Sequence, residues 1–492
     1  MTLANIIRDC PRLEAHHPWP RILVSEEQWC AIASALRCEG LTLSGFWGEA
    51  EAVHMAIMDE ASGLAVISLN CPNGNFPSVG QFHPPAIRLE RAIRDLFGLV
   101  PRDSPDRRSW LDHGRWYASD STPSPYAFIA NEGENLHQIA VGPVHAGIIE
   151  PGHFRFTANG ETVVRLEQRL GYVHKGIEAL MAGADIAHGA KLAGRTSGDS
   201  TVAYAIAFAR AVESAARVEV STRAHFLRAL MAELERLANH FGDVGAICND
   251  ASFALIHAHC GILRERVLRA ADSSFGHRLM RDCVVPGGVA VDLKADSAAI
   301  LRALVDEARA KFPALVKLYD DTASLQDRTV TTGILTPALA SQFGVGGYVG
   351  RASGRAFDAR RALPYSPYES LRFDVPMRED GDVNARLWIR IREVEQSLSL
   401  IEQILAQLPD GATHIDVPAR AGGEGMAVVE GFRGDILVWL RLNDEGRIAR
   451  CHLRDPSWFQ WPLLEAAIEG NIVADFPLIN KSFNCSYSGH DL

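Results

Sequence analysis

The sequence predicts an α+β protein of two parts: a small N-terminal α/β domain with its linker over residues 1–125, and a larger domain over residues 126–492 in which a helical bundle carries peripheral β-sheets. Three observations support this class. Helical spacing mixes with short strand-like runs in the first part, Ala-rich and Leu-spaced helical patterns fill the middle, and alternating apolar residues return near the C-terminus. With 492 residues, of which 47% are hydrophobic, the chain is long enough for two or three cores.

The N-terminal elements follow from local spacing. Residues 23–40 have helical spacing, and residues 52–59 and 63–70 have the pattern of short strands. An amphipathic helix is predicted over residues 85–98, where apolar residues alternate with arginines. Residues 101–125 are rich in Pro, Asp, Ser and Arg, which indicates a linker.

The larger domain opens with a predicted hairpin of strands within residues 142–156 and 161–170. Helices are expected over residues 177–184, 201–215, 221–242, 253–272, 296–319 and 384–408, in patterns that suit a bundle. Strands are expected again within residues 412–455, and a last helix and strand within residues 461–479.

Charge and composition exclude some classes of function. The net charge is −11, and no long basic run is present, so we expect no nucleic-acid partner. No stretch of about 18 apolar residues is present and the first residues do not resemble a secretion signal, so we expect a cytoplasmic protein. The nine cysteines are scattered singly without C-x-x-C spacing, which implies neither disulfides nor a thiolate metal site.

Several polar residues are candidates with more than one interpretation. Glu150 lies in a turn between His145 and His153, where it is either a solvated acid or a proton relay. The two histidines are either hydrogen-bonded structural groups or ligands. His240, Asp243 and Asp250 are either a buried network or polar groups near a helix end. The arginines Arg351, Arg355, Arg360 and Arg361 form either a solvated face or a surface for an anion or another subunit.

A series of stretches, taken in order, resembles a known family. They are residues 142–156, 170–178, 233–250, 285–289, 344–365, 381–398 and 455–462. Together they resemble the large subunits of membrane-bound, energy-converting [NiFe] hydrogenases of the formate-hydrogenlyase type, which are similar to quinone-module subunits of respiratory complex I. Residues 89–101 and 107–116 resemble the complex I small subunit that is fused N-terminally in these hydrogenases.

The resemblance places the family's metal ligands on this chain. In catalytic members two C-x-x-C pairs hold nickel and iron. With Arg195 as the anchor, the first pair falls on Ser197 and Ser200, and the second falls on Cys485 and Ser488. Because serine hydroxyls substitute poorly for thiolates, the resemblance implies a chain without a nickel–iron centre.

Other residues around that position are retained. Glu150 matches the family's proton-relay glutamate, and Arg433 matches the arginine that overhangs the metal site. With Glu150, His153 is expected to deliver protons in a cleft between the 142–156 hairpin and the helix after Arg195.

The similarity to complex I implies a second kind of site, in which a tyrosine and a histidine hold a quinone headgroup. The tyrosine falls on Gly198 and the histidine at or near Pro151, so both ligands are missing here. Asp250 matches the acid coupled to that histidine and is present. A quinone bound in an altered pose is therefore one possible electron acceptor for this chain.

The resemblance implies an oxidoreductase subunit of a membrane-associated complex. The expected partners are an iron–sulfur small subunit with a [4Fe–4S] cluster and antiporter-like membrane subunits, which would hold the chain on the cytoplasmic face of the inner membrane. The chain would exchange electrons through the partner cluster. The alternatives are a non-catalytic scaffold or coupling subunit, a quinone reductase and, as a minority view, an active hydrogenase.

Overall fold

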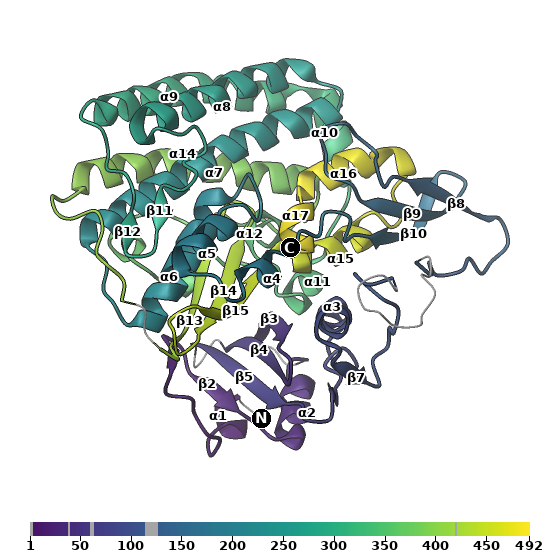
Figure 1. The fold of residues 1–492 in the computed structure, drawn as a ribbon. Coiled ribbons are helices and arrows are strands. Elements are labelled where there is room, and N and C mark those ends of the chain that lie inside the picture. Colours follow the sequence, from purple (N-terminus) through teal and green to yellow (C-terminus); the bar gives the residue numbers. More distant parts are fainter. Residues whose placement is uncertain (1–2, 38–39, 60–62, 114–125, 419–420) are drawn as a thin grey trace.

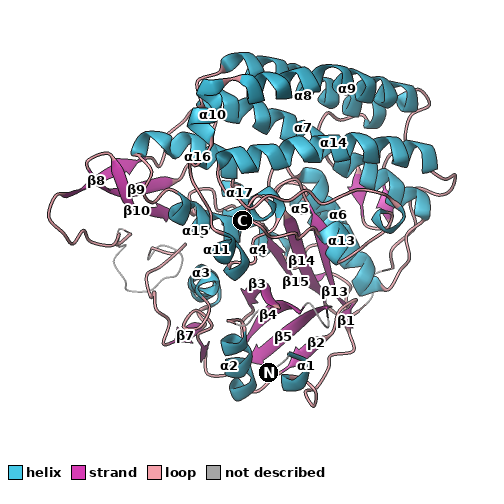
Figure 2. Cartoon of the chain, turned by 180° about the vertical axis from the view of Figure 1, so that it is seen from behind, coloured by secondary structure: helices cyan, strands magenta, loops and turns pink. Residues whose placement is uncertain are grey.

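A β-sheet formed mainly by residues 424–454 lies between an N-terminal unit and a helical bundle, and a second sheet, of residues 136–169, lies at one side of the molecule (Figure 1). The computed structural model describes residues 3–37, 40–59, 63–113, 126–418 and 421–492. The bundle lies at the end of the molecule opposite the N-terminus, and the C-terminus lies near the centre, where bundle and sheets meet (Figures 1 and 2). The predicted α+β class is confirmed.

The N-terminal unit is a four-stranded sheet flanked by helices, with strand order β2-β5-β4-β3. Its elements are α1 (Leu3–Ile6), β1 (His16–His17), β2 (Arg21–Leu23), α2 (Glu26–Ala35), β3 (Leu41–Gly48), β4 (Ala52–Asp59), β5 (Gly63–Asn70), β6 (Asn75–Pro77), α3 (Ile87–Phe97) and β7 (Val100–Arg102). The strands predicted at 52–59 and 63–70 have these bounds, whereas β3 was missed. α2 begins at Ser25, which forms a capping box with Gln28.

Part of the segment after β7 packs against α3. Trp110 is only 1% exposed, and the backbone N–H groups of Trp110 and Leu111 donate to Asp95 on α3 at 2.6 and 2.8 Å. These contacts hold residues 110 and 111 against α3, while the assignment of residues 101–125 as a linker stays a prediction. Residues 114–125, and with them the predicted domain boundary, lie outside the described residues.

The helical bundle is built around one long helix, α7. Its main helices are α6 (Thr201–Ala216), α7 (Thr222–Asp250), α8 (Ala254–Phe275), α9 (Ser297–Asp321) and α14 (Val383–Gln407). α7 continues past Gly242, where the sequence predicted an end. A Cβ at Gly245 would lie 2.9 Å from Cys260 Cβ, so this stretch of α7 serves close packing against α8 instead of ending the helix.

Short helices connect the bundle to the sheets. They are α4 (Ile177–Met181), α5 (Ile186–Ala193), α10 (Ala323–Thr329), α11 (Pro337–Gln342), α12 (Gly347–Arg351) and α13 (Ala359–Ala362). A two-stranded ribbon, β11 (Val284–Val285) with β12 (Gly288–Val289), completes this part.

Two further sheets and the C-terminal helices surround the point where the chain ends. The predicted hairpin is confirmed as β9 (His153–Asn159) and β10 (Thr162–Arg169), with β8 (Leu136–Val141) added at the β9 edge. The second sheet has the order β1-β13-β14-β15, from β13 (Glu424–Glu430), β14 (Asp435–Leu442) and β15 (Ile448–Arg454). Its last neighbours are α15 (Ser457–Ala467), α16 (Phe476–Phe483) and α17 (Tyr487–Asp491), so the strand predicted before residue 479 is wrong.

The described cysteines are free, and all except the half-buried Cys30 are buried. None of the helices in the described part of the chain has the length and apolar character that a membrane span requires.

Candidate functional site

Two segments far apart in the sequence meet beside the N-terminus of α6. The loop before α6 brings Ser197 and Ser200, the turn after α16 brings Cys485, and the first turn of α17 brings Ser488. The exposed fractions of these four residues lie between 2% and 6%. The Ser197 Oγ lies 2.9 Å from the Ser486 Oγ, which joins the two segments directly. The structure thus brings the expected positions together, and hydroxyl contacts fill part of the space.

Arg433 forms the charged part of this site, together with a residue that the sequence did not single out. Arg433 Nη2 donates to Asp199 Oδ2 at 2.6 Å, and Nη1 donates to Asp199 Oδ1 at 3.2 Å. Burial alone would raise the pKa of the Asp199 carboxyl, but the Arg433 guanidinium holds this pKa below its usual range. The Asp199 side chain is 38% exposed and that of Arg433 is 3% exposed. Solvent therefore reaches the carboxylate of this ion pair but not the guanidinium.

The donor atoms at this site do not fit a nickel–iron centre. Such centres use soft thiolates, whereas the structure offers one thiol and three hydroxyls. Burial raises the pKa of the Cys485 thiol well above its ordinary value, which disfavours the thiolate that a metal needs. Among the described residues, no group of three His, Cys, Asp or Glu side chains is placed to hold a metal ion.

Glu150 lies against the second segment. Its Oε2 accepts from the Ser488 backbone N–H at 2.9 Å. In the same loop between β8 and β9, His145 Nε2 lies 3.4 Å from the Tyr487 hydroxyl. The loop therefore contacts both Tyr487 and Ser488, although Glu150 itself is exposed.

The other two candidate residues have different neighbours. The His153 ring lies 4.9 Å from the Phe128 ring and accepts from Arg155 Nε at 3.3 Å, and burial and Arg155 lower its pKa. Asp250 is the last residue of α7, where burial raises its pKa despite the charge of Lys481. Within the described part of the chain, no hydrogen bond or ion pair joins His153 or Asp250 to Glu150 or Arg433.

A buried polar chain runs from Arg433 into the bundle. Arg433 Nε donates to the Asn484 carbonyl at 2.5 Å, and the Asn484 side chain donates to Asp243 at 2.9 Å. Asp243 also accepts from Arg390 Nε at 3.0 Å. His240, one turn before Asp243, lies 2.7 Å from Glu393. The buried-network interpretation therefore holds for His240 and Asp243.

Of the arginine run after residue 350, Arg351 and Arg360 are buried, whereas Arg355 is half-buried and Arg361 is exposed. Arg351 is 0% exposed and contacts Glu393 at 2.5 Å and Glu430 at 2.9 Å. Arg360 is 3% exposed and contacts Glu233 at 3.0 Å. The solvated-face interpretation is wrong for these two arginines, because acidic residues on α7, α14 and β13 compensate their charges. Sequence spacing gave no signal for those distant partners.

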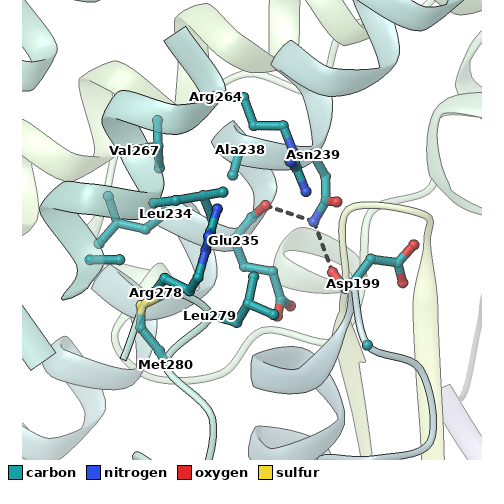
Figure 3. A pocket seen from close by; sticks show the side chains of 13 residues that line it. Asp199, Leu234, Glu235, Ala238, Asn239, Arg264, Val267, Arg278, Leu279 and Met280 are labelled. Carbon is teal, nitrogen blue, oxygen red and sulfur yellow. Dashed lines mark hydrogen bonds between the residues drawn. The ribbon is translucent and has the colours of Figure 1, made fainter. Parts of the chain in front are cut away.

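A narrow cavity of about 20 Å³ reaches the same loop from the side of α8 (Figure 3). Gly198, Glu235, Asn239 and Arg264 are among its lining residues. Asn239 Nδ2 donates to the Asp199 carbonyl at 2.8 Å, while the Asp199 carboxylate points away from Glu235. Burial raises the pKa of Glu235 to about 8, although its carboxylate accepts two backbone N–H groups of α6. The cavity has room for about one water molecule and not for a quinone headgroup.

Comparisons with known proteins agree with this architecture. The family described as "Respiratory-chain NADH dehydrogenase, 49 Kd subunit" matches residues 256–422 and 415–491. The chain is 31% identical to formate hydrogenlyase subunit 5 of Escherichia coli, over 86% of this chain and 78% of that protein. It is 33% identical to an NADH-quinone oxidoreductase subunit of Roseiflexus, over 70% of this chain and 96% of that protein.

The fold also matches a solved respiratory complex. A chain in the structure of the membrane-bound sulfane sulfur reductase, an archaeal respiratory membrane complex, superposes with a TM-score of 0.69 at 25% identity. The match covers 74% of this chain and 100% of that chain. Fold and matches together define an oxidoreductase subunit of the hydrogenase and complex I type. More closely, the chain belongs to the family of 49 kDa subunits of respiratory NADH dehydrogenase and the large subunits of formate-hydrogenlyase-type hydrogenases.

Proposed function

We propose that this chain is an electron-transfer subunit of a membrane-associated respiratory complex that acts without a nickel–iron centre. Electrons pass through a [4Fe–4S] cluster on a partner small subunit, and antiporter-like subunits complete the complex in the membrane. The chain then lies on the cytoplasmic face of the inner membrane. The names of the relatives support this assembly, since they include a formate hydrogenlyase, a quinone oxidoreductase and a respiratory membrane complex.

The observation that carries the proposal is that two charged residues, Glu150 and Arg433, lie beside the positions where the resemblance places metal ligands. Glu150 still contacts Ser488, and Arg433 is still aimed at the Ser200 hydroxyl, at 3.3 Å. Glu150 is the residue that delivers protons to a small acceptor in this site, and Arg433 stabilises the negative charge that develops on reduction. His153 and Asp250 would take part only through further groups, given their present contacts.

The test is reoxidation of the partner cluster in the purified complex. We expect a small acceptor to reoxidise the cluster, and we expect Glu150→Gln to slow the reaction because the amide keeps a hydrogen-bond acceptor but transfers no proton. Glu161→Gln, at the exposed turn between β9 and β10, is the matched control and should leave the rate unchanged. A complex whose cluster is reoxidised by no quinone or other small acceptor would count against a redox role.

A scaffold or coupling role is the second candidate, and the filled site favours it. The Ser197–Ser486 contact and the Asp199–Arg433 pair, which join the site residues to one another, support this candidate. If the role is purely structural, Glu150→Gln and Arg433→Ala complexes that assemble should work at the wild-type rate. Stoichiometric nickel in the purified protein would contradict both candidates and favour a hydrogenase.

A further inference from the structure

The Asp199 carboxylate is bound by the rest of the site in the way that a ligand is bound. Its Oδ1 accepts from the Ser197 hydroxyl at 2.8 Å and from the Ser200 hydroxyl at 3.2 Å. Both its oxygens also accept from Arg433. We call these donors, the Ser197 and Ser200 hydroxyls and the Arg433 guanidinium, the carboxylate cradle.

The cradle lies beneath its occupant. Ser197, Ser200 and Arg433 are each 2–3% exposed, whereas the Asp199 side chain is 38% exposed. The carboxylate therefore covers buried donors with one side turned to solvent. Removal of this one group would leave a guanidinium and two hydroxyls at the base of a hollow that a solute can reach. A planar, two-oxygen anion suits such a fork of donors.

The loop that carries Asp199 has space around it. A Cβ added at Gly198 would meet no atom within 4 Å, and Gly198 and Asp199 both line the small cavity. Arg264 and Arg278, two further cationic residues, line that cavity. The backbone next to Asp199 is therefore not tightly packed at Gly198.

We propose that the cradle is a binding subsite for the carboxylate group of a small molecule, and that Asp199 closes it in the isolated chain. This inference deepens the proposed function and rests on it for one point only, that the bound molecule is the acceptor. Serines at the former thiolate positions then have a role of their own, since they donate to an anion where cysteines would bind metal. A tethered carboxylate competes strongly with a free one, because it is held at high effective concentration. Wild-type protein therefore binds a free carboxylate weakly.

The experiment removes the tethered group and supplies a free one. Asp199→Ala leaves Arg433 uncompensated, so its melting temperature should fall by a few degrees. Sodium formate has the size of the group removed, and it should restore the lost melting temperature with saturation at a roughly millimolar dissociation constant. Sodium chloride at equal concentration should not restore the melting temperature. In the Asp199→Ala, Arg433→Ala double variant, neither salt should raise the melting temperature.

The matched control is a second Asp–Arg pair on the same chain. Asp282 accepts two hydrogen bonds from Arg195, at 2.7 and 2.8 Å, but both side chains are 41% exposed. Asp282→Ala should therefore gain nothing from formate. Should Asp199→Ala not fold, Asp199→Ser is measured in the same way, because it also removes the charge.

The inference is overturned if formate leaves the melting temperature of the Asp199 variant unchanged, or if chloride restores it equally. These outcomes are separate from those of the redox test. A complex that reduces no acceptor but whose Asp199 variant binds formate would refute the proposed function alone. Formate rescue that fails in an active complex would refute only the subsite.

Discussion

The Ser197 and Ser486 hydroxyls lie 2.9 Å apart and join segments separated by 289 residues. Ser197 also donates to Asp199, so one buried hydroxyl connects the loop before α6 both to the ion pair and to the turn after α16. Hydrogen bonds thus hold together two segments that lie far apart in the sequence.

Ser197→Ala should therefore destabilise the protein by about 1–3 kcal/mol, because the Ser486 hydroxyl and the Asp199 carboxylate each lose a hydrogen-bond partner. The free energy of unfolding in urea measures this effect. Ser273→Ala, at an exposed position of α8, is the control and should change the stability by less than about 0.5 kcal/mol. Equal stability of the two variants would show that the serine contacts are not structural.

Arg351 is the centre of the buried charges beneath the site. Its guanidinium contacts Glu393 on α14 and Glu430 on β13, and all three side chains are at most 2% exposed. Arg351→Met keeps the volume and removes the charge, which leaves two buried carboxylates without a main partner. We expect a loss of about 3–5 kcal/mol.

The control for Arg351 is Arg392, whose side chain is 55% exposed and pairs with Glu395 on the same helix. Arg392→Met should cost at most about 1 kcal/mol. A mild effect of Arg351→Met would mean that other arginines, such as Arg236, compensate the acidic residues, and that the network is redundant.

The architecture was predictable from the sequence where periodicity is strong. The strands at 52–59 and 63–70, the 87–97 helix and the long bundle helices follow from apolar spacing alone. The helix predicted to end at Gly242 continues to Asp250, because Gly245 lets α7 pack closely on α8. Composition alone did not reveal that Trp110 is buried and bonded to α3.

The site was predictable only in part. The resemblance pointed to Ser197, Ser200, Cys485 and Ser488, and in the structure the two segments that carry them are joined by the Ser197–Ser486 contact, while their role stays a prediction. Asp199 was missed, because a single aspartate in a loop has no periodic signal and its partner lies 234 residues away. The Arg351 partners were missed for the same reason, since buried ion pairs depend on contacts between elements distant in sequence.

Close packing of α6 on β13 sets the position of the loop that carries Ser197 and Asp199. A Cβ at Gly425 on β13 would lie 1.9 Å from the Ala211 carbonyl oxygen on α6. Gly425→Ala must therefore push the helix off the sheet, and we expect a loss of at least about 1–3 kcal/mol. In contrast, Gly261→Ala on α8 meets open space and should stabilise the protein by about 0.5–1 kcal/mol. In thermal unfolding, we expect Gly425→Ala to lower the melting temperature and Gly261→Ala to raise it. A Gly425→Ala variant as stable as wild type would contradict the packing argument.

His54 makes the junction between the two four-stranded sheets sensitive to acid. Its ring is 0% exposed and lies 5.5 Å from the Trp47 ring and 5.6 Å from the Trp439 ring. Nδ1 lies 2.9 Å from the Ser68 hydroxyl, and Nε2 lies 3.4 Å from Glu49. Burial lowers the pKa of His54 to about 4 despite the nearby carboxylate. The ring is therefore neutral in the folded protein at neutral pH, and Arg441 rather than His54 compensates Glu49.

The sign of the pH effect follows from this lowered pKa. An unfolded histidine takes up its proton near pH 6.5, whereas folded His54 does so only near pH 4. Between these values the unfolded state binds more protons, so the free energy of unfolding falls as the pH falls, by up to about 1.4 kcal/mol per pH unit for this one group. His54→Gln removes the titration, so its urea stability should fall less than that of wild type between about pH 7 and about pH 5. His137→Gln, at an exposed position of β8, should keep the wild-type slope, and an unchanged slope in His54→Gln would assign the acid sensitivity to other buried histidines.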